Sequence, residues 1–253
     1  MLPQEYQTMR TVEDSYWWYR TLRSHVVREL AKRLLPDAHV LDAGCGTGGM
    51  LDSLRRHPAH WQLSGLDLSP DAVRLTKDRG FDSITEGSIS SMPMAAEQCD
   101  AVVCLDVLYH KAVDETAALH ELHRILKPGG WLLLNLPAWD SLAGEHDRAV
   151  HGARRYTPER IRSLLAPPLW QIESLHGWNA LLFPAVWTSR QLSRLRNHAA
   201  TEPAQSDLKP LPSPINQLLA SISAADLAVC RSFQIPIGTS LFAIARRPFP
   251  PTS

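Results

Sequence analysis

A short glycine-rich segment near the N-terminus constrains the fold of this chain more than any other sequence feature. The segment is LDAGCGTGG at residues 41–49, and it continues an apolar stretch that begins at His39. Glycines let the backbone turn tightly and let a ligand approach it closely. Gly44, Gly46 and Gly49 have the spacing of a strand–turn–helix motif that several classes of nucleotide-binding protein share. The segment therefore predicts a strand, a tight turn and a helix, with a ligand site at the turn.

Strand-like and helix-like segments alternate after this turn. Apolar stretches predict strands at residues 39–44, 61–67, 81–86, 100–106 and 131–136. Amphipathic stretches between them predict crossover helices, and Ser69 followed by Pro70 is typical of a capped helix start. Such alternation is typical of a doubly wound α/β sheet with parallel strands. Two last strands are expected at residues 171–176 and 239–245, with helices at 181–196 and 215–231 between them.

We expect one main domain with two helical additions. A chain of 253 residues suits a single domain with an elaboration. The long segment before the final strand is interpreted as a helical cap over the core. The expected division is an N-terminal helical lid at 1–36, a core at 37–180 and 237–248, and a helical cap at 181–236.

The composition indicates which partners this chain can bind and in which cell compartment it lies. The chain has 26 basic and 26 acidic residues, and a net charge of zero argues against a general nucleic-acid binder. Its four cysteines form no CxxC pair, so we expect free buried thiols, a reducing compartment and no metal site. No signal peptide is expected at the N-terminus, and no apolar run reaches the roughly 18 residues that cross a membrane. A cytoplasmic location is the expectation.

Two aspartates after the first two strands narrow the choice of ligand. Asp67 ends the second strand about twenty residues after the glycine turn, where a carboxylate can accept both ribose hydroxyls of an adenosine. Asp42 lies directly before the glycines. A carboxylate there repels a pyrophosphate but suits an ammonium or a sulfonium group. Asp42 therefore counts against an NAD-dependent oxidoreductase, which stays an alternative on the same glycines.

Together, five segments resemble the class I S-adenosylmethionine-dependent methyltransferases. The matching pieces, in family order, are VLDAGCGTG, LDLSP, EGSISSMPM, CDAVVCLDVLYH and LHRILKPGGWLLLNLP, within residues 38–140. The resemblance implies a seven-stranded Rossmann-like sheet whose last strand is antiparallel, and S-adenosyl-L-methionine as the cofactor. Many relatives have Asp where Ser88 stands, and a hydroxyl there makes a weaker contact with the adenine.

The resemblance also implies roles for individual residues. The backbone of the glycine turn would contact the methionine part of the cofactor, Asp67 the ribose and Leu68 the adenine. Ser88 and Ile89 would lie at the adenine edge, and Leu105 would offer its backbone to the amino-acid end. The full set of expected cofactor residues is Trp18, Arg20, Asp42, Gly44, Cys45, Gly46, Asp67, Leu68, Ser88, Ile89, Leu105 and His110.

Four consecutive aromatic residues, Tyr16 to Tyr19, open the chain's first helical region. They either pack this helix on the sheet or form a lid whose aromatic faces attract a sulfonium. In the second case Arg20 or Arg23 would reach the cofactor carboxylate. This start also resembles a bacterial subgroup of these enzymes with paired N-terminal tryptophans. His110 is expected to shape the pocket rather than to react.

A loop after the fifth strand, GEHDRAVHGARRY at residues 144–156, is expected to face the acceptor. Ligands of open α/β sheets bind outside the carboxyl ends of the strands. His146, His151 and Tyr156 are therefore the candidate catalytic residues, with Asp147 as an orienting acid. The alternative is a polar loop whose Asp147 pairs with its own arginines.

The predicted function is methyl transfer to a small, apolar or anionic acceptor, with O-, N- and C-methylation all open. A non-catalytic S-adenosylmethionine-binding protein is a further alternative. Nucleic-acid methylation is disfavoured, because Leu105 to Leu108 replaces the Asn-Pro-Pro-aromatic signature of those enzymes. The apolar segment 181–187 is expected to pack in the core, to line the acceptor pocket, or to touch a membrane surface beside Arg190, Arg194 and Arg196. The sequence leaves the oligomeric state open.

Overall fold

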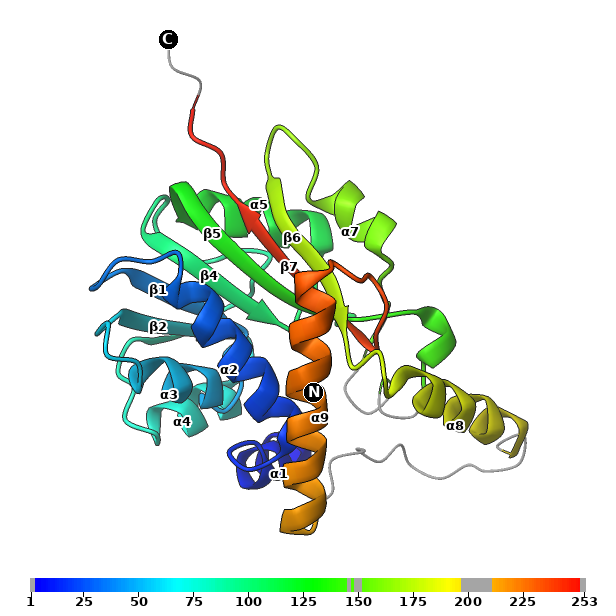
Figure 1. The fold of residues 1–253 in the computed structure, drawn as a ribbon. Helices are drawn as coiled ribbons and strands as arrows, with labels where there is room; N and C mark the ends of the chain where they lie inside the picture. The colour runs from blue at the N-terminus through cyan, green and yellow to red at the C-terminus, as the bar shows by residue number, and fades with distance from the viewer. Residues whose placement is uncertain (1–2, 145–146, 148–151, 197–210, 251–253) are drawn as a thin grey trace.

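A seven-stranded sheet forms the centre of the computed structural model, which describes residues 3–144, 147, 152–196 and 211–250. The strand order is β3-β2-β1-β4-β5-β7-β6, as Figure 1 shows. Strands β1 to β5 pair in parallel, and β7 pairs antiparallel with both β5 and β6. The predicted fold, including the antiparallel last strand, is therefore confirmed. The strands are β1 His39–Ala43, β2 Gln62–Asp67, β3 Ile84–Glu86, β4 Cys99–Leu105, β5 Leu126–Pro137, β6 Gln171–Trp178 and β7 Ser240–Arg246.

Short polar residues set where several helices begin. The hydroxyl of Ser69 accepts a hydrogen bond from the backbone N–H of Ala72, and Pro70 is the first helical residue, as predicted. Thr157 and Asp114 cap two later helices in the same way. The helices are α1 Pro3–Val12, α2 Trp17–Ala31, α3 Gly49–Arg55, α4 Pro70–Lys77, α5 Glu115–Ile125, α7 Pro158–Leu164, α8 Phe183–Arg196 and α9 Ser213–Ser232, with a 3-10 turn η1 at Asp140–Leu142.

Both faces of the sheet are covered by helices. Alternate residues of β4 belong to two different buried clusters: Val102 packs in the cluster that contains α5 and α7, and Val103 in the cluster that contains α2 and α3. A strand buried on both faces needs apolar side chains in both directions, which explains the unbroken apolar stretch in the sequence. The crossover helices thus fix the central strands, whose carboxyl ends all meet at one edge.

The segment expected to form a cap contains two helices with different surroundings. α9 packs against β6 and α2, so it is part of the helical layer in front of the sheet in Figure 1. α8 extends past the edge of the sheet, next to η1. The division into lid, core and cap stays a prediction, but α8 and η1 are placed beside the carboxyl ends of the strands.

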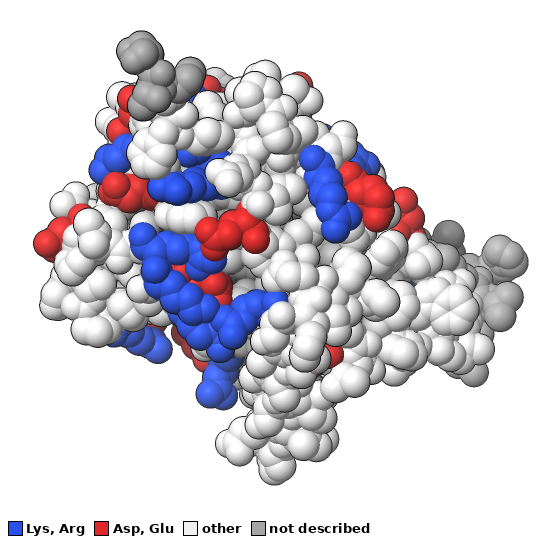
Figure 2. All heavy atoms as spheres, turned by 45° about the horizontal axis from the view of Figure 1, so that its top comes forward, with Lys and Arg blue, Asp and Glu red and all other residues white. Residues whose placement is uncertain are grey.

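The distribution of surface charges and the burial of the cysteine thiols are typical of a globular protein. Basic and acidic side chains lie next to one another on the face shown in Figure 2, and Glu29 forms ion pairs with Lys32, Arg33 and Arg231. All four cysteines are free and buried, as predicted. Within the described ranges, no helix has the length and apolar character needed to cross a bilayer.

Candidate functional site

A cavity of about 670 Å³ lies at the carboxyl ends of the parallel strands. Cavities of this size hold small-molecule ligands and cofactors in many proteins. Every residue that the sequence assigned to the cofactor lines it except Arg20. Those lining residues are Trp18, Asp42, Gly44, Cys45, Gly46, Asp67, Leu68, Ser88, Ile89, Leu105 and His110.

The glycine turn closes tightly beneath this cavity. Gly44 has φ +89°, and a Cβ atom at this position would lie 2.2 Å from Cγ2 of Val107. Both the conformation and the close neighbour exclude a side chain there. The backbone N–H groups of Gly44 and Cys45 donate to the carbonyl of Leu66 at 2.7 and 3.0 Å, which ties the turn to the end of β2. The turn thus presents backbone, not side chains, to the cavity at Gly44.

Asp42, the residue before the last in β1, is a buried carboxylate, 2% exposed. Its Oδ2 has no hydrogen-bond partner within the described part of the chain. Burial raises the pKa of Asp42 to about 7; the charge of Arg23 opposes this, while those of Asp67 and Glu13 add to it. An unpartnered buried carboxylate is costly to the protein unless a ligand satisfies it. The site therefore fits a cationic group near the glycine turn.

Asp67 ends β2 and faces the same cavity. Its carboxylate accepts hydrogen bonds from the backbone N–H groups of Gly46 and Ser69, each at 2.9 Å. These bonds fix the carboxylate, and each oxygen keeps a second lone pair for a ligand hydroxyl. Burial raises the pKa of Asp67 above its usual value.

Beyond Asp67, apolar residues flank the cavity. Leu68 is 56% exposed although it is a large apolar side chain, and Ile89 is buried on the other loop. The hydroxyl of Ser88 accepts a hydrogen bond from the backbone N–H of Ser90 at 3.1 Å, so it still has a proton to donate. A slot with apolar sides and a hydroxyl at its edge suits a flat heteroaromatic ring.

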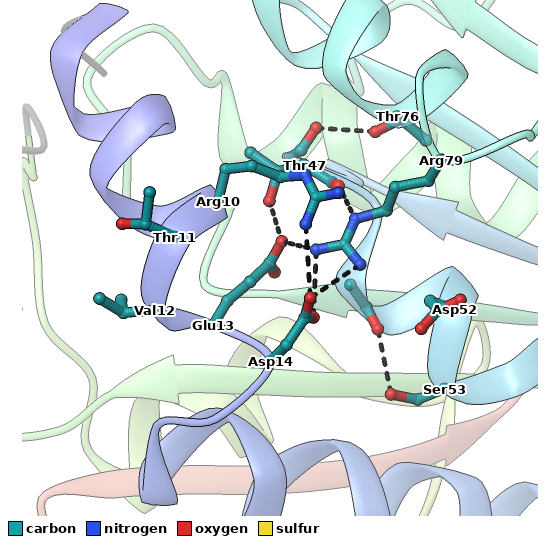
Figure 3. A network of polar contacts seen from close by, with 12 residues as sticks. Arg10, Thr11, Val12, Glu13, Asp14, Thr47, Asp52, Ser53, Thr76 and Arg79 are labelled. Atoms are coloured by element: carbon teal, nitrogen blue, oxygen red, sulfur yellow. Dashed lines mark hydrogen bonds and ion pairs between the residues drawn. The ribbon is translucent and has the colours of Figure 1, made fainter. Parts of the chain in front are cut away.

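The N-terminal segment, which comprises α1 and its junction with α2, forms part of the cavity wall. Tyr6, Met9 and Glu13 of this segment all line it. The carboxylate of Glu13 is buried and accepts hydrogen bonds from the hydroxyl of Thr47 and the guanidinium of Arg79, as Figure 3 shows. It also accepts a hydrogen bond from the guanidinium of Arg23.

Asp14 adds to this anchor, since Nη2 of Arg79 lies 3.1 Å from its Oδ1. These polar contacts hold the α1–α2 junction against the glycine turn and α4. The sequence analysis missed this cluster. Glu13 and Asp14 precede the aromatic run, but no sequence signal pairs them with Arg79, which lies 65 residues or more away.

The aromatic run at the start of α2 both lines the cavity and packs against the sheet. All four residues from Tyr16 to Tyr19 line the cavity, and Trp18 also packs on Trp178 with ring centroids 5.3 Å apart. The expectation for Arg20 is wrong, because this side chain is exposed and does not line the cavity. Arg23 lines it instead, one helical turn further on, with its guanidinium over the ring of Tyr19.

The loop after β5 meets the cavity through Asp147 and Arg155. Nε and Nη2 of Arg155 both donate to Asp147 at 3.1 Å, and Nη1 donates to the carbonyl of Ala138 at 2.9 Å. The sequence analysis gave two interpretations of this loop, a set of catalytic residues or a polar loop in which Asp147 pairs with its own arginines. The contacts of Asp147 with Arg155 are those of the second interpretation. His146 and His151 lie outside the described residues.

Tyr156 does not face the cavity, which corrects the expectation of a catalytic role. Its side chain is fully buried, and its hydroxyl donates to Oε1 of Glu115 at 2.6 Å. The guanidinium of Arg160 lies over the ring. A hydroxyl in this position cannot reach a molecule in the cavity, and Tyr156 instead fixes the loop to α5.

Asp106 is a further carboxylate in the cavity that the sequence analysis did not select. It follows β4 directly, has φ +55°, and accepts a hydrogen bond at Oδ2 from the side-chain amide of Asn135 at 2.8 Å. Burial raises its pKa to about 7 against the opposing effects of Asn135 and Arg155. The rule that selected Asp42 and Asp67, an acid at the carboxyl end of a parallel strand, also selects Asp106.

Further walls of the cavity come from residues in or next to β5, β6, β7, η1 and α8. Four of these eight residues are apolar, and the other four carry an amide, two hydroxyls and a guanidinium. The residues are Pro137, Leu142, Asn179, Leu182, Val186, Arg190, Thr239 and Ser240. The cavity therefore has two ends: an acidic end over β1 and β2, and an apolar end below α8.

Comparisons with known proteins agree with this geometry. Residues 41–134 match a sequence family described as a methyltransferase domain. This part of the chain therefore resembles methyltransferase domains. A ubiquinone biosynthesis O-methyltransferase of Xanthomonas oryzae pv. oryzae is 38% identical over 107 residues, 40% of this chain and 44% of the relative. A ubiquinone/menaquinone biosynthesis C-methyltransferase of Syntrophotalea carbinolica is 35% identical over 120 residues, 46% of this chain and 49% of the relative. The methyltransferase match thus spans about half the length of these curated relatives.

Solved structures show the same fold. A putative methyltransferase of Haloferax volcanii, in complex with the Trm112 methyltransferase activator, has a TM-score of 0.62 at 19% identity, over 97% of this chain and 94% of that one. Geranyl diphosphate C-methyltransferase of Streptomyces coelicolor, solved with S-adenosyl-L-homocysteine, has a TM-score of 0.58 at 16% identity, over 90% and 82% of the two chains. The methyltransferase fold therefore extends beyond residues 41–134 to nearly the whole chain.

Proposed function

We propose that this chain transfers a methyl group from S-adenosyl-L-methionine to a small-molecule acceptor. The observation that carries the proposal is the position of Asp42, a buried carboxylate with an unpartnered oxygen, in one cavity with the glycine turn and Asp67. A dinucleotide would bring a pyrophosphate to this turn, and the charge of Asp42 would repel it. The comparisons also do not favour an oxidoreductase.

The described residues fit the parts of this cofactor. Asp42 would compensate its positive charge, and the two oxygens of Asp67 would accept the ribose hydroxyls. Leu68 and Ile89 would enclose the adenine, with the hydroxyl of Ser88 at its edge. When bound, the cofactor supplies a methyl carbon made electrophilic by a sulfonium.

The chain's own contribution would be alignment and exclusion of water. α1 and the aromatic start of α2 cover the cavity, and the Glu13 cluster holds this cover in place. In-line displacement at carbon disperses charge in the transition state, so a dry and aligned site accelerates it. Trp18 and Tyr19 place aromatic faces where a sulfonium would be attracted.

The acceptor would occupy the apolar end of the cavity. Leu142, Leu182 and Val186 provide apolar walls, and Arg155 provides a positive charge. These features support an acceptor with an apolar body, as do the names of the relatives, which concern methylation at oxygen or at carbon in quinone biosynthesis. The buried free thiols fit a reducing compartment such as the cytoplasm, which we propose as its location.

The test uses cofactor labelled with deuterium in its methyl group. Purified protein is incubated with this cofactor and a small-molecule extract, and mass spectrometry follows S-adenosylhomocysteine and the labelled product. Formation of both supports the proposal. Cofactor binding without either product would favour a non-catalytic binding protein, and quenching of NADH fluorescence without cofactor binding would favour an oxidoreductase.

A further inference from the structure

A chain of three hydrogen-bonded side chains ends at the carboxylate of Asp106. Nε1 of Trp178 donates to Oδ1 of Asn135 at 2.9 Å, and Nδ2 of Asn135 donates to Oδ2 of Asp106 at 2.8 Å. Trp178 and Asn135 are both fully buried. The indole can only donate, so it fixes which end of the Asn135 amide faces Asp106. Three strands, β4, β5 and β6, thus cooperate to orient one carboxylate.

The backbone of Asp106 is held in a conformation that side chains seldom adopt. Its φ of +55° lies in the left-handed region, and its N–H donates to the carbonyl of Asn135 at 2.9 Å. Residues held in such conformations are concentrated at functional sites, where surrounding contacts compensate the strain. The carboxylate lies at the carboxyl end of the central strand β4, between the two ends of the cavity.

Two other acids of the cavity are already engaged by cations. Asp147 is held by Arg155, and Glu13 by Arg23 and Arg79. Asp106 forms no ion pair within 4.0 Å in the described part of the chain, and Asn135 engages only its Oδ2. Asp106 therefore differs from Asp147 and Glu13, each of which has a cation within ion-pair distance. Asp106 is oriented by Asn135, while the charge of Arg155 acts on it from beyond ion-pair distance.

We propose that Asp106 is the general base for a weakly acidic, phenol-like hydroxyl on the acceptor. This assignment rests on the proposed methyl transfer. The acceptor O–H bond breaks and its proton moves to the carboxylate of Asp106. The oxygen electron pair forms the new bond to the methyl carbon, and the electrons of the C–S bond return to sulfur, which leaves as a neutral thioether.

The chemistry of the site selects the hydroxyl. A carboxylate whose pKa burial raises to about 7 is still ionised in part at neutral pH, and is a stronger base than an ordinary aspartate. A phenol has a pKa of about 10, within reach of such a base, whereas an aliphatic alcohol is far less acidic. Trp18, Tyr19 and Tyr109 provide aromatic walls.

The reaction is measured with saturating cofactor, whose positive charge would hold Asp42 ionised, so its pH dependence should come mainly from Asp106. Burial together with the charge of Asp106 raises the pKa values of Tyr19, Tyr109 and Cys104. These groups therefore stay uncharged at neutral pH. We expect log kcat/KM for a neutral phenol to rise with pH and to level off above pH 7.

The experiment combines kinetics with a direct titration of the carboxylate. Catechol and 4-nitrocatechol serve as probe acceptors. Wild type is compared with Asp106→Asn, Asp106→Glu and the control Asp100→Asn, which changes an acid at the opposite end of the same strand. In parallel, ¹³C NMR of protein labelled at the aspartate carboxyl carbons follows Asp106 in the S-adenosylhomocysteine complex, with Asp106→Asn identifying its signal.

We expect Asp106→Asn to lose about 10²- to 10⁴-fold in kcat and to lose the rise with pH, while the Kd for S-adenosylhomocysteine changes less than threefold. Asp106→Glu should recover part of the rate, and Asp100→Asn should match wild type. The NMR signal should titrate near pH 7 and move when catechol binds. If Asp106→Asn is unfolded, Asp106→Glu identifies the signal instead, and the titration of wild type decides.

Two results would overturn the assignment. One is an Asp106→Asn variant that keeps its rate and its pH profile; the other is an Asp106 signal that ignores catechol in the S-adenosylhomocysteine complex. Wild type that fails to bind S-adenosylhomocysteine would instead refute the proposed methyl transfer. The two failures are therefore distinguishable.

Discussion

Replacing Asp42 with asparagine should stabilise the free protein at neutral pH, although it removes a carboxylate that we assign to the cofactor. Asp42 is 2% exposed and one of its oxygens has no hydrogen-bond partner among the described residues. Without a cationic ligand, ionisation of this group destabilises the folded state. Asparagine has nearly the same shape and cannot ionise.

The size of this effect follows from the pKa of Asp42. Burial raises it from 3.8 to about 7. Each pKa unit corresponds to about 1.4 kcal/mol, so the ionised carboxylate destabilises the folded state by about 4 kcal/mol. A raised pKa means that the folded state binds the proton more tightly than the unfolded state. Wild-type stability should therefore fall as the pH rises from about 4 to about 7, and stay constant above that for this group.

The assay is urea unfolding of ligand-free wild type and Asp42→Asn between pH 4 and pH 8, since bound cofactor would itself add stability. The two proteins should be nearly equal at pH 4, and the variant should be more stable by up to about 4 kcal/mol at pH 8. Asp100→Asn is the matched control, because Asp100 pairs with Lys127 away from the cavity. A difference that does not change with pH, or a variant less stable than wild type at pH 8, would refute the reasoning.

Three further predictions concern other positions. Burial lowers the pKa of His25 to about 2, so its contribution to stability is complete above pH 6.5 and is lost below it, by about 2 kcal/mol at pH 5. Urea unfolding of His25→Gln should show a shallower acid slope, and an unchanged slope would contradict this. Arg79→Met removes a cation from Glu13, so limited proteolysis should cleave α1 faster than in wild type; equal rates would argue against the anchor. Gly44→Ala places a Cβ 2.2 Å from Val107, so the free energy of unfolding should fall by about 1–3 kcal/mol, and a loss below about 0.5 kcal/mol would contradict the contact.

The sequence predicts the sheet well, because its strands are defined by local patterns. The apolar stretch of β4 and the glycine turn after β1 each determine structure within a few residues. The packing of α9 has no such local signal. Its apolar face fits a cap as well as a sheet, and contact with α2 and β6 joins parts of the chain far apart in sequence.

The sequence predicts site residues well at the ends of strands, and less well on helices, where packing decides which side chains face the cavity. Asp42 and Asp67 were selected because the carboxyl ends of parallel strands converge on the ligand. Asp106 satisfies the same rule, and it was missed because only the backbone of Leu105 was considered there. The choice between Arg20 and Arg23 depends on which face α2 presents to the cavity, and tertiary packing decides that.

The most direct test of the account is calorimetric titration of wild type with S-adenosyl-L-homocysteine, together with Asp67→Asn. The account predicts saturable binding at one site per chain and an affinity at least tenfold lower in the variant, which loses a charged partner of the ribose hydroxyls. The Asp100→Asn control should bind as wild type does. No binding by wild type at millimolar ligand, or equal affinity in Asp67→Asn, would contradict the central claim that this cavity holds the cofactor.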